Sequence, residues 1–126
     1  MPEALKETVA ILELTKGKSI RSTIELMPII RRGLPSASLA AVARRMDISA
    51  VATVESLGLA KRTIARRLQE GRALTAEESE RVVRLARVLA QATEVLGTVE
   101  KARRWLQKPN RVLGGELPLR MLDTDI

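Results

Sequence analysis

The sequence predicts an all-helical protein. No stretch of the chain alternates apolar and polar residues strictly, as a half-buried strand would, whereas apolar residues recur at spacings of three and four. Proline, glycine and residues that cap helices divide the chain into successive segments. We therefore expect a series of helices around one aliphatic core.

Two helices are expected in the first third of the chain. A short amphipathic helix is expected over residues 8–14, and Lys16-Gly17-Lys18 would end it. A second helix is expected over residues 22–32, where Pro28 would bend it or begin its second half. Gly33-Leu34-Pro35 then closes this element.

A third helix is expected directly after this break. The hydroxyl of Ser36 or Ser38 can accept a hydrogen bond from a backbone N–H of its first turn, which would cap the helix. Its apolar positions recur at three and four residues and are Leu39, Val42, Ala43 and Met46.

Residues 49–70 have the outline helix, short turn, helix, which is that of a helix-turn-helix. Ser49 can cap the first of these helices. Its inward positions are expected to be Val51, Val54 and Leu57. Gly58-Leu59 provides the turn, and the second helix is expected from about Ala60 to Glu70, with its end at Gly71.

The longest helix is expected to begin at Thr75-Ala76-Glu77-Glu78, a capping-box pattern in which the Thr hydroxyl and a Glu carboxylate satisfy reciprocal backbone donors. One stripe of this helix comprises Val82, Leu85, Ala86, Leu89, Ala92 and Leu96, while Arg81, Arg84 and Arg87 face elsewhere. Gly97 ends it. Thr98 caps a further helix, expected over residues 98–108 and halted by Pro109, and Pro118 would open a last one.

Composition excludes several classes of function. The chain has 126 residues, of which 45% are hydrophobic and 29% charged, with one Trp and no Phe or Tyr. Because Cys and His are absent, disulfides, Cys/His zinc sites and catalysis by an imidazole or thiolate are excluded. No signal peptide is evident, and the longest uncharged run is about half the length of a membrane-spanning helix. We expect a cytoplasmic protein without cofactor, metal or enzymatic activity.

The net charge of +7 is concentrated in the middle of the chain. Residues 1–15 have a net charge of −2, residues 16–72 of +8 and residues 73–126 of +1. A polyanion such as DNA is the natural partner of the middle segment. The nearly neutral C-terminal half is expected to serve another purpose.

The helix expected over residues 60–70 meets the requirements of a helix that reads the major groove. At about 100° per residue, Ile64 and Leu68 define its buried side. Three side chains lie nearly opposite, namely Arg62, Arg66 and Gln69. Since arginine can make two hydrogen bonds to guanine and glutamine two to adenine, we expect Arg62 and Arg66 to contact bases. Contacts nearer the DNA backbone are expected from Lys61, Thr63 and Arg67.

The alternative is that these cations only solvate an exposed helix. Five basic residues and one acid lie between Lys61 and Arg72, whereas a solvated face usually mixes charges. The glycine turn before the helix also favours the DNA-binding interpretation. Against it, Ala60 offers no side chain to cap the helix start.

The segment from Trp105 to Leu119 combines the only aromatic residue with two prolines and a Gly-Gly pair. Trp105 either anchors its helix to the rest of the fold or is exposed at a partner interface. Gly114-Gly115 permits a positive φ or the close approach of another backbone. From composition alone, this stretch could also be a stiff structural loop.

The same segment resembles the C-terminal domain of Xre/MbcA/ParS-type antitoxins. The motifs that carry the resemblance are Trp105-Leu106, Pro109-Asn110, Leu113-Gly114-Gly115, Pro118-Leu119 and Leu122-Asp123-Thr124. Further motifs of the family lie upstream, namely Leu57-Gly58-Leu59, Arg62-Thr63-Ile64-Ala65-Arg66-Arg67, Leu74-Thr75-Ala76-Glu77-Glu78-Ser79-Glu80-Arg81 and Leu85-Ala86-Arg87-Val88. The resemblance covers the chain from about residue 34 onward.

The resemblance implies an antitoxin of a type II toxin–antitoxin system. Family members join a DNA-binding helix-turn-helix to a toxin-binding domain and repress their own operon as oligomers, and their toxins are often RES-domain enzymes that destroy NAD. By this resemblance the toxin-binding residues would be Trp105, Pro109, Asn110, Leu113, Gly114 and Gly115. Members usually continue past the Leu-Asp-Thr motif with a helix of about twenty residues, whereas this chain ends at Ile126. We expect either a truncated chain or a member without that helix.

The domain organisation expected from these observations has three parts. Residues 1–20 form an N-terminal extension, residues 21–72 the DNA-binding region and residues 73–126 the toxin-binding domain. Because helix-turn-helix proteins usually bind as dimers, we expect at least a homodimer, with a contact from residues 1–33. Two alternatives stay open: a stand-alone repressor whose C-terminal domain only dimerises, and an interaction protein that binds no DNA.

Overall fold

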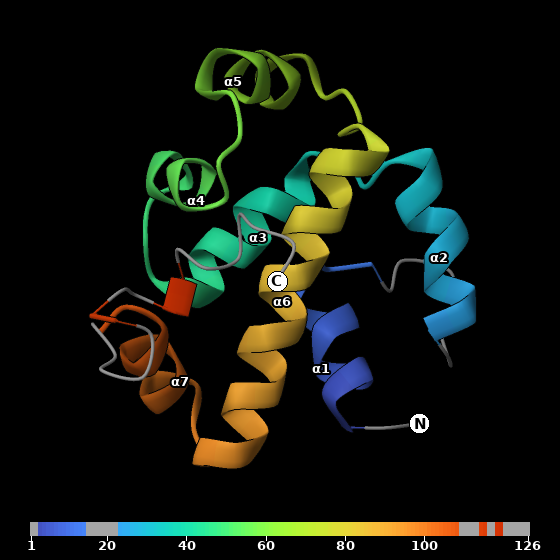
Figure 1. The fold of residues 1–126 in the computed structure, drawn as a ribbon. Coiled ribbons are helices and arrows are strands. Elements are labelled where there is room, and N and C mark those ends of the chain that lie inside the picture. Colours follow the sequence, from blue (N-terminus) through green and yellow to red (C-terminus); the bar gives the residue numbers. More distant parts are fainter. Residues whose placement is uncertain (1–2, 15–22, 109–113, 116–117, 120–126) are drawn as a thin grey trace.

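The central element of the fold is α6 (Ala76–Leu96), a helix of 21 residues that runs through the molecule with the other helices around it (Figure 1). α1 (Glu3–Ile11) and α2 (Thr23–Arg32) lie along one side of it, and α3 (Ala37–Met46) and α7 (Val99–Leu106) along the other. α4 (Ala50–Ser56) packs on α3, and α5 (Lys61–Glu70) packs on α4 at one end of the molecule.

This computed structural model describes residues 3–14, 23–108, 114–115 and 118–119. Within these ranges every regular element is a helix, which confirms the all-helical class. Pro118 and Leu119 form a short helical turn, and both are buried.

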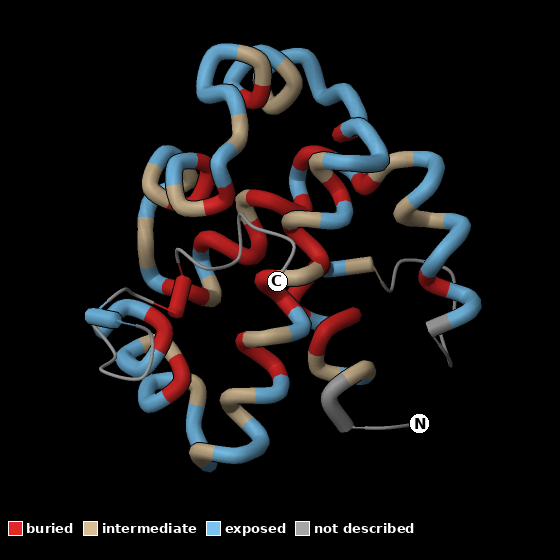
Figure 2. The backbone as a smooth tube through the Cα atoms, in the orientation of Figure 1, coloured by how far each residue is buried: buried red, intermediate tan, exposed pale blue. Residues whose placement is uncertain are grey.

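An aliphatic core surrounds α6 on several sides (Figure 2). Of the stripe predicted for this helix, Val82, Leu85, Ala86 and Leu89 are fully buried, and Ala92 and Leu96 are half-buried. Val83 and Ala90 are buried as well, which the sequence did not predict. The buried face is wider than one stripe because α6 has neighbours on both sides.

Three predicted caps are confirmed. The hydroxyl of Ser49 accepts the N–H of Ala52, and that of Thr98 accepts the N–H of Lys101. Thr75 and Glu78 form the complete capping box at the start of α6. The predicted ends at Gly71 and Gly97 are also present, at φ values of 67° and 95° that favour glycine.

The predicted cap at the start of α3 is wrong. Ser36 is in a helical conformation and its hydroxyl donates to the backbone oxygen of Arg67, while the Ser38 hydroxyl donates to the backbone oxygen of Leu12. Both residues are buried, so their hydroxyls tie α3 to neighbouring segments in place of its own N-terminus.

Three further predictions need adjustment. The first helix begins at Glu3 and ends at Ile11, before the predicted Leu14, while Lys16-Gly17-Lys18 lies outside the described residues. The last long helix ends at Leu106, before the predicted Lys108. Val51 was predicted to face inward but is 58% exposed, because α4 buries only the side that carries Val54 and Leu57.

A short backbone junction joins the start of α3 to the start of α6. Pro35 and Ala73 form an isolated antiparallel bridge, and the Leu74 N–H donates to the Leu34 oxygen over 2.9 Å. The Leu34 N–H donates to the Ser79 hydroxyl over 2.8 Å. At Gly33, where φ is 97°, a Cβ atom would lie 2.0 Å from the Leu74 oxygen. Only glycine fits this position.

Candidate DNA-binding and partner-binding surfaces

α4, α5 and the turn between them form the predicted helix-turn-helix. Gly58 takes a φ of 66° in the turn, a backbone conformation that residues with a side chain rarely adopt. Arg81 of α6 donates from its Nη1 to the backbone oxygens of Leu57 and Gly58, each over 3.1 Å. The central helix therefore holds the turn directly, a role that the periodicity of α6 did not reveal.

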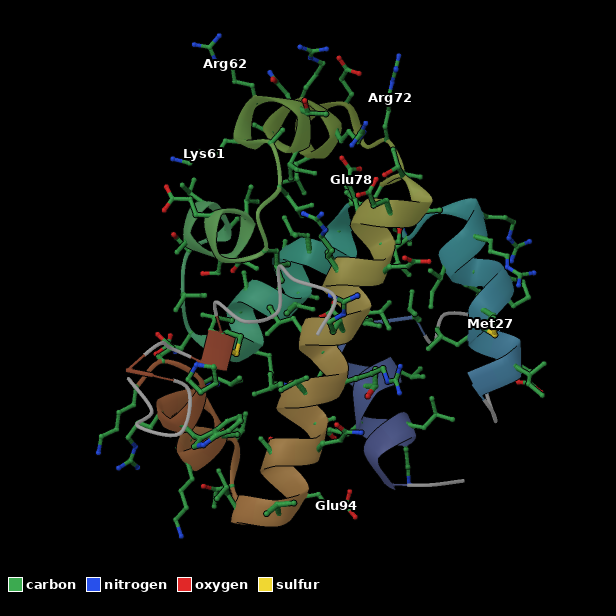
Figure 3. The ribbon with its side chains drawn as sticks, viewed as in Figure 1. Met27, Lys61, Arg62, Arg72, Glu78 and Glu94 are labelled. Carbon is green, nitrogen blue, oxygen red and sulfur yellow. The ribbon has the colours of Figure 1, made fainter. Side chains whose placement is uncertain are left out.

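The two faces of α5 are as predicted. Ile64 is fully buried and Leu68 half-buried, whereas Arg62, Arg66 and Gln69 are exposed. In Figure 3 the Arg62 side chain extends from α5 away from the rest of the molecule. The exposed side of the helix thus presents two guanidinium groups and an amide, the groups that can pair with base edges.

The flanking residues have different surroundings. Lys61 pairs with Glu55 of α4 over 2.5 Å, and its side chain is 59% exposed. Thr63 is half-buried. Arg72, just beyond α5, pairs with Glu70 over 2.9 Å and is exposed. The cations of Lys61 and Arg72 lie on the surface and stay accessible to a polyanion.

Arg67, unlike Lys61 and Arg72, forms an ion pair that is largely removed from solvent. Its Nη1 donates to Oε1 of Glu78 at the start of α6, and the two side chains are only 22% and 14% exposed. The same Oε1 atom accepts the backbone N–H of Thr75 over 2.8 Å. Arg67 was predicted to lie near the DNA backbone; in this structure its guanidinium fastens α5 to the capping box of α6.

The surroundings of Glu78 favour its charged form. Burial alone would raise the pKa of this carboxyl, but the Thr75 N–H and the Arg67 guanidinium lower the pKa below its ordinary value. The ion pair is therefore fully formed at neutral pH.

The second candidate surface is formed by α6 and α7. α7 is anchored by Ala102 and Leu106, both fully buried, and by a hydrogen bond of 2.5 Å from Arg103 Nε to the backbone oxygen of Arg45. Trp105 is 40% exposed and lines a groove of about 350 Å³. The other residues that line this groove are Val88, Gln91, Ala92, Val95 and Leu96 of α6. Sequence reasoning did not identify this groove.

The Gly-Gly pair owes its identity to backbone conformation. Gly114 and Gly115 have φ values of 68° and 87°, and no atom lies within 4 Å of where a Cβ atom would stand. Of the two reasons considered for this pair, the structure supports the positive φ. Pro109, Asn110 and Leu113, the other predicted toxin-binding residues, lie outside the described residues.

Two comparisons with protein families cover residues 25–126 apart from residues 88–90. Residues 25–87 match the antitoxin Xre-like helix-turn-helix domain, and residues 91–126 match the antitoxin Xre/MbcA/ParS C-terminal toxin-binding domain. The chain belongs to the Xre/MbcA/ParS antitoxin family. The first match contains α4 and α5, and the second contains Trp105 and most of the groove.

Three proteins that are similar to this chain support its membership of the family. An Antitoxin Xre of Photorhabdus laumondii is 30% identical over 112 residues, which cover 88% of this chain and 76% of the relative. An Antitoxin Xre of Pseudomonas putida is 41% identical over 63 residues, which cover 50% of this chain but only 40% of the relative. A Sphingobium protein named Prs ADP-ribosylating antitoxin is 25% identical over 112 residues, covering 82% of this chain and 70% of the relative.

The described residues show neither a membrane span nor a metal site. No helix among them is long and apolar enough to cross a bilayer. No three acidic side chains in the described part of the chain converge as metal ligands would. The clustered carboxylates of Glu77 and Glu78 lie in the first turn of α6, where they interact favourably with the helix dipole.

Proposed function

We propose that this chain is an antitoxin that binds and neutralises a cognate toxin and represses its own operon by binding operator DNA. The observation that carries the proposal is the exposed side of α5, where Arg62, Arg66 and Gln69 lie opposite the buried Ile64. This helix belongs to a chain whose second part matches a toxin-binding domain. The protein would act in the cytoplasm, where its operator and toxin are found.

In this proposal α5 enters the major groove of the operator. Arg62 and Arg66 would each donate two hydrogen bonds to the O6 and N7 of a guanine, and Gln69 would pair with an adenine. Lys61 and Thr63 would contact the sugar–phosphate backbone, with Lys61 exchanging Glu55 for a phosphate. Arg67 would contribute indirectly, by holding α5 on α6 through Glu78.

The operator complex would contain at least two copies of the chain. Helix-turn-helix proteins usually present two recognition helices to half-sites about one helical turn, roughly 34 Å, apart. We therefore propose a homodimer, in which the segment of residues 1–33 supplies a contact between the copies. α2 within this segment exposes Ile24 and Met27.

The toxin is proposed to be an enzyme that consumes NAD, most simply a RES-domain enzyme that degrades it. The name of the Sphingobium relative refers to ADP-ribosylation, a reaction that also consumes NAD. Trp105, Gly114 and Gly115 would contribute to the surface that holds the toxin, together with the predicted Pro109, Asn110 and Leu113. The NAD chemistry would belong to the toxin, and the chain would only block it.

Two experiments test the proposal. The product of the neighbouring gene is assayed for NAD consumption alone and together with this chain, and we expect the chain to abolish consumption. The chain is also mixed with its own promoter in a gel-shift assay at physiological salt, and we expect a specific complex. Repression without any binding of the neighbouring protein would instead indicate a stand-alone repressor, and absence of a DNA complex would refute autorepression.

A further inference from the structure

The groove between α6 and α7 is an apolar hollow whose α6 lining has no role in the functions proposed above. Val88, Ala92, Val95 and Leu96 line it from α6 and Trp105 from α7. Val95 is 83% exposed and Trp105 is 40% exposed, and because both line the same groove they belong to one exposed apolar patch. Its volume of about 350 Å³ lies within the range typical of binding pockets, about 300–1,000 Å³.

The groove is continuous with the region that matches the toxin-binding domain. All of its lining residues except Val88 fall within residues 91–126. Val99, Ala102 and Leu106 pack α7 against the core, so the groove lies between two helices that are both held by core contacts. The surface is therefore available on a well-packed scaffold.

A cation borders the groove on the α7 side. Lys101 precedes Trp105 by four residues within α7, which places both side chains on one face of the helix. Lys101 is exposed. The one acid of α7, Glu100, lines a different hollow together with Asp47 and Lys108, and Figure 3 shows Glu94 of α6 pointing away from α7. The border next to Trp105 is thus positively charged.

We infer that this groove binds an amphipathic helix of the toxin, with aliphatic side chains inserted between α6 and α7 and an acidic side chain facing Lys101. A helix that docks into an apolar groove uses anchors spaced by three and four residues, which suits a groove built from Val88, Ala92 and Val95 at the same spacing. This inference rests on the proposed toxin-binding function.

Charge argues against a second copy of this chain as the occupant. The chain has a net charge of +7, and bringing another strongly basic molecule to a lysine border would be repulsive. An acidic helix of a different protein gains both from the apolar contact and from the border. The proposal therefore commits to the toxin rather than to self-association.

The test uses one exposed aliphatic residue in the groove and one matched residue outside it. Val95→Asp places a charge in the groove, while Val51→Asp makes the identical change on α4, where Val51 is 58% exposed. Affinity for the purified product of the neighbouring gene is measured by calorimetry with the full chain, and circular dichroism checks that each variant is folded. We expect Val95→Asp to weaken binding about tenfold or more and Val51→Asp to change it less than about twofold.

The single Trp supplies an independent readout. The chain is labelled with 5-fluorotryptophan, so that Trp105 gives the only fluorine signal. We expect this signal to shift when the unlabelled neighbouring protein is added, and Lys101→Glu to weaken the complex without altering the signal of the free chain.

Each outcome bears on the inference in a distinguishable way. If the chain neutralises the neighbouring protein but Val95→Asp binds as tightly as the unchanged chain and the fluorine signal does not move, the groove is not the docking site while the antitoxin function stands. If the fluorine signal shifts with concentration in the chain alone and Val95→Asp abolishes self-association, the occupant is a second copy. If no binding occurs at all, the proposed toxin-binding function fails and the inference fails with it.

Discussion

The ion pair between Arg67 and Glu78 should contribute measurably to stability, because both side chains are largely removed from water. Glu78→Gln removes the charge but keeps an oxygen that can accept the Thr75 N–H, since glutamine also serves in a capping box. Exposed ion pairs contribute about 0.2–1 kcal/mol, and breaking a fully buried pair costs about 3–5 kcal/mol. With exposures of 22% and 14%, the pair lies between these limits. We expect Glu78→Gln to lower the free energy of unfolding by about 1–2 kcal/mol.

Urea denaturation followed by circular dichroism measures this loss. Arg67→Met is the matching change, because methionine keeps much of the aliphatic side chain while removing the charge. In a double-mutant cycle the two substitutions should cost less together than the sum of the single losses, with a coupling energy of about 1 kcal/mol.

The same pair sets a pH dependence. The pKa of Glu78 in the folded chain is below its ordinary value of 4.5. As the pH falls, the Glu78 carboxylate is therefore protonated in the unfolded chain before it is protonated in the folded chain. The stabilisation is therefore fully present above about pH 4.5 and is lost as the pH falls through the lower folded pKa. The stability difference between the unchanged chain and Glu78→Gln should shrink below that pH. Equal stability of the two at pH 7, or a difference that does not depend on pH, would refute the reasoning.

Three further predictions follow from single positions. Arg66→Ala should weaken operator binding by about 1–3 kcal/mol and relax selectivity at one base pair, as measured by gel shift with substituted operators; equal losses on all sequences would contradict base reading. An alanine in the left-handed backbone conformation costs roughly 1–2 kcal/mol. Gly33→Ala should lower the free energy of unfolding by well over this amount, because the new Cβ atom would also lie 2.0 Å from the Leu74 oxygen. Gly71→Ala is the control, because Gly71 also has a positive φ, 67°, but no atom lies within 4 Å of its Cβ position. If thermal melts showed the same loss of stability for both variants, a clash at Gly33 would be excluded. Thr75→Ala should cost about 1 kcal/mol of unfolding free energy through the lost cap, and an unchanged urea midpoint would count against it.

Features that depend on neighbouring residues in the sequence could be predicted. The two faces of α5 follow from helical periodicity over ten residues, so the burial of Ile64 and the exposure of Arg62 and Arg66 agree with expectation. The cap at Ser49 and the capping box at Thr75 are likewise local, because each hydroxyl bonds a backbone N–H three residues ahead.

Features that depend on contacts between distant segments could not be predicted from the sequence. The sequence around Ser36 favours a helix cap, yet its hydroxyl bonds the backbone oxygen of Arg67, 31 residues away. The sequence around Arg67 favours a phosphate contact, yet its guanidinium pairs with Glu78, 11 residues away. The groove at Val95 has the same origin: α6 and α7 must be brought together before the exposed valine and Trp105 form one surface. Only the tertiary arrangement decides which of several satisfactory hydrogen bonds or contacts a side chain makes.

α6 belongs to both proposed surfaces but at different ends. Arg81 and Glu78 near its start hold the turn and the recognition helix, whereas Val95 near its end lines the groove. At 1.5 Å per residue, Arg81 and Val95 are about 20 Å apart along the helix axis, and no described residue contributes to both surfaces. A helix of the toxin in the groove would therefore leave the base-reading side chains of the same chain uncovered. We expect Val95→Asp to leave operator affinity unchanged in the absence of toxin and Arg66→Ala to leave toxin affinity unchanged, when each is measured by titration at fixed salt. A loss of DNA binding in the folded Val95→Asp variant would mean that the two ends of α6 are energetically coupled and that the surfaces cannot be treated as independent.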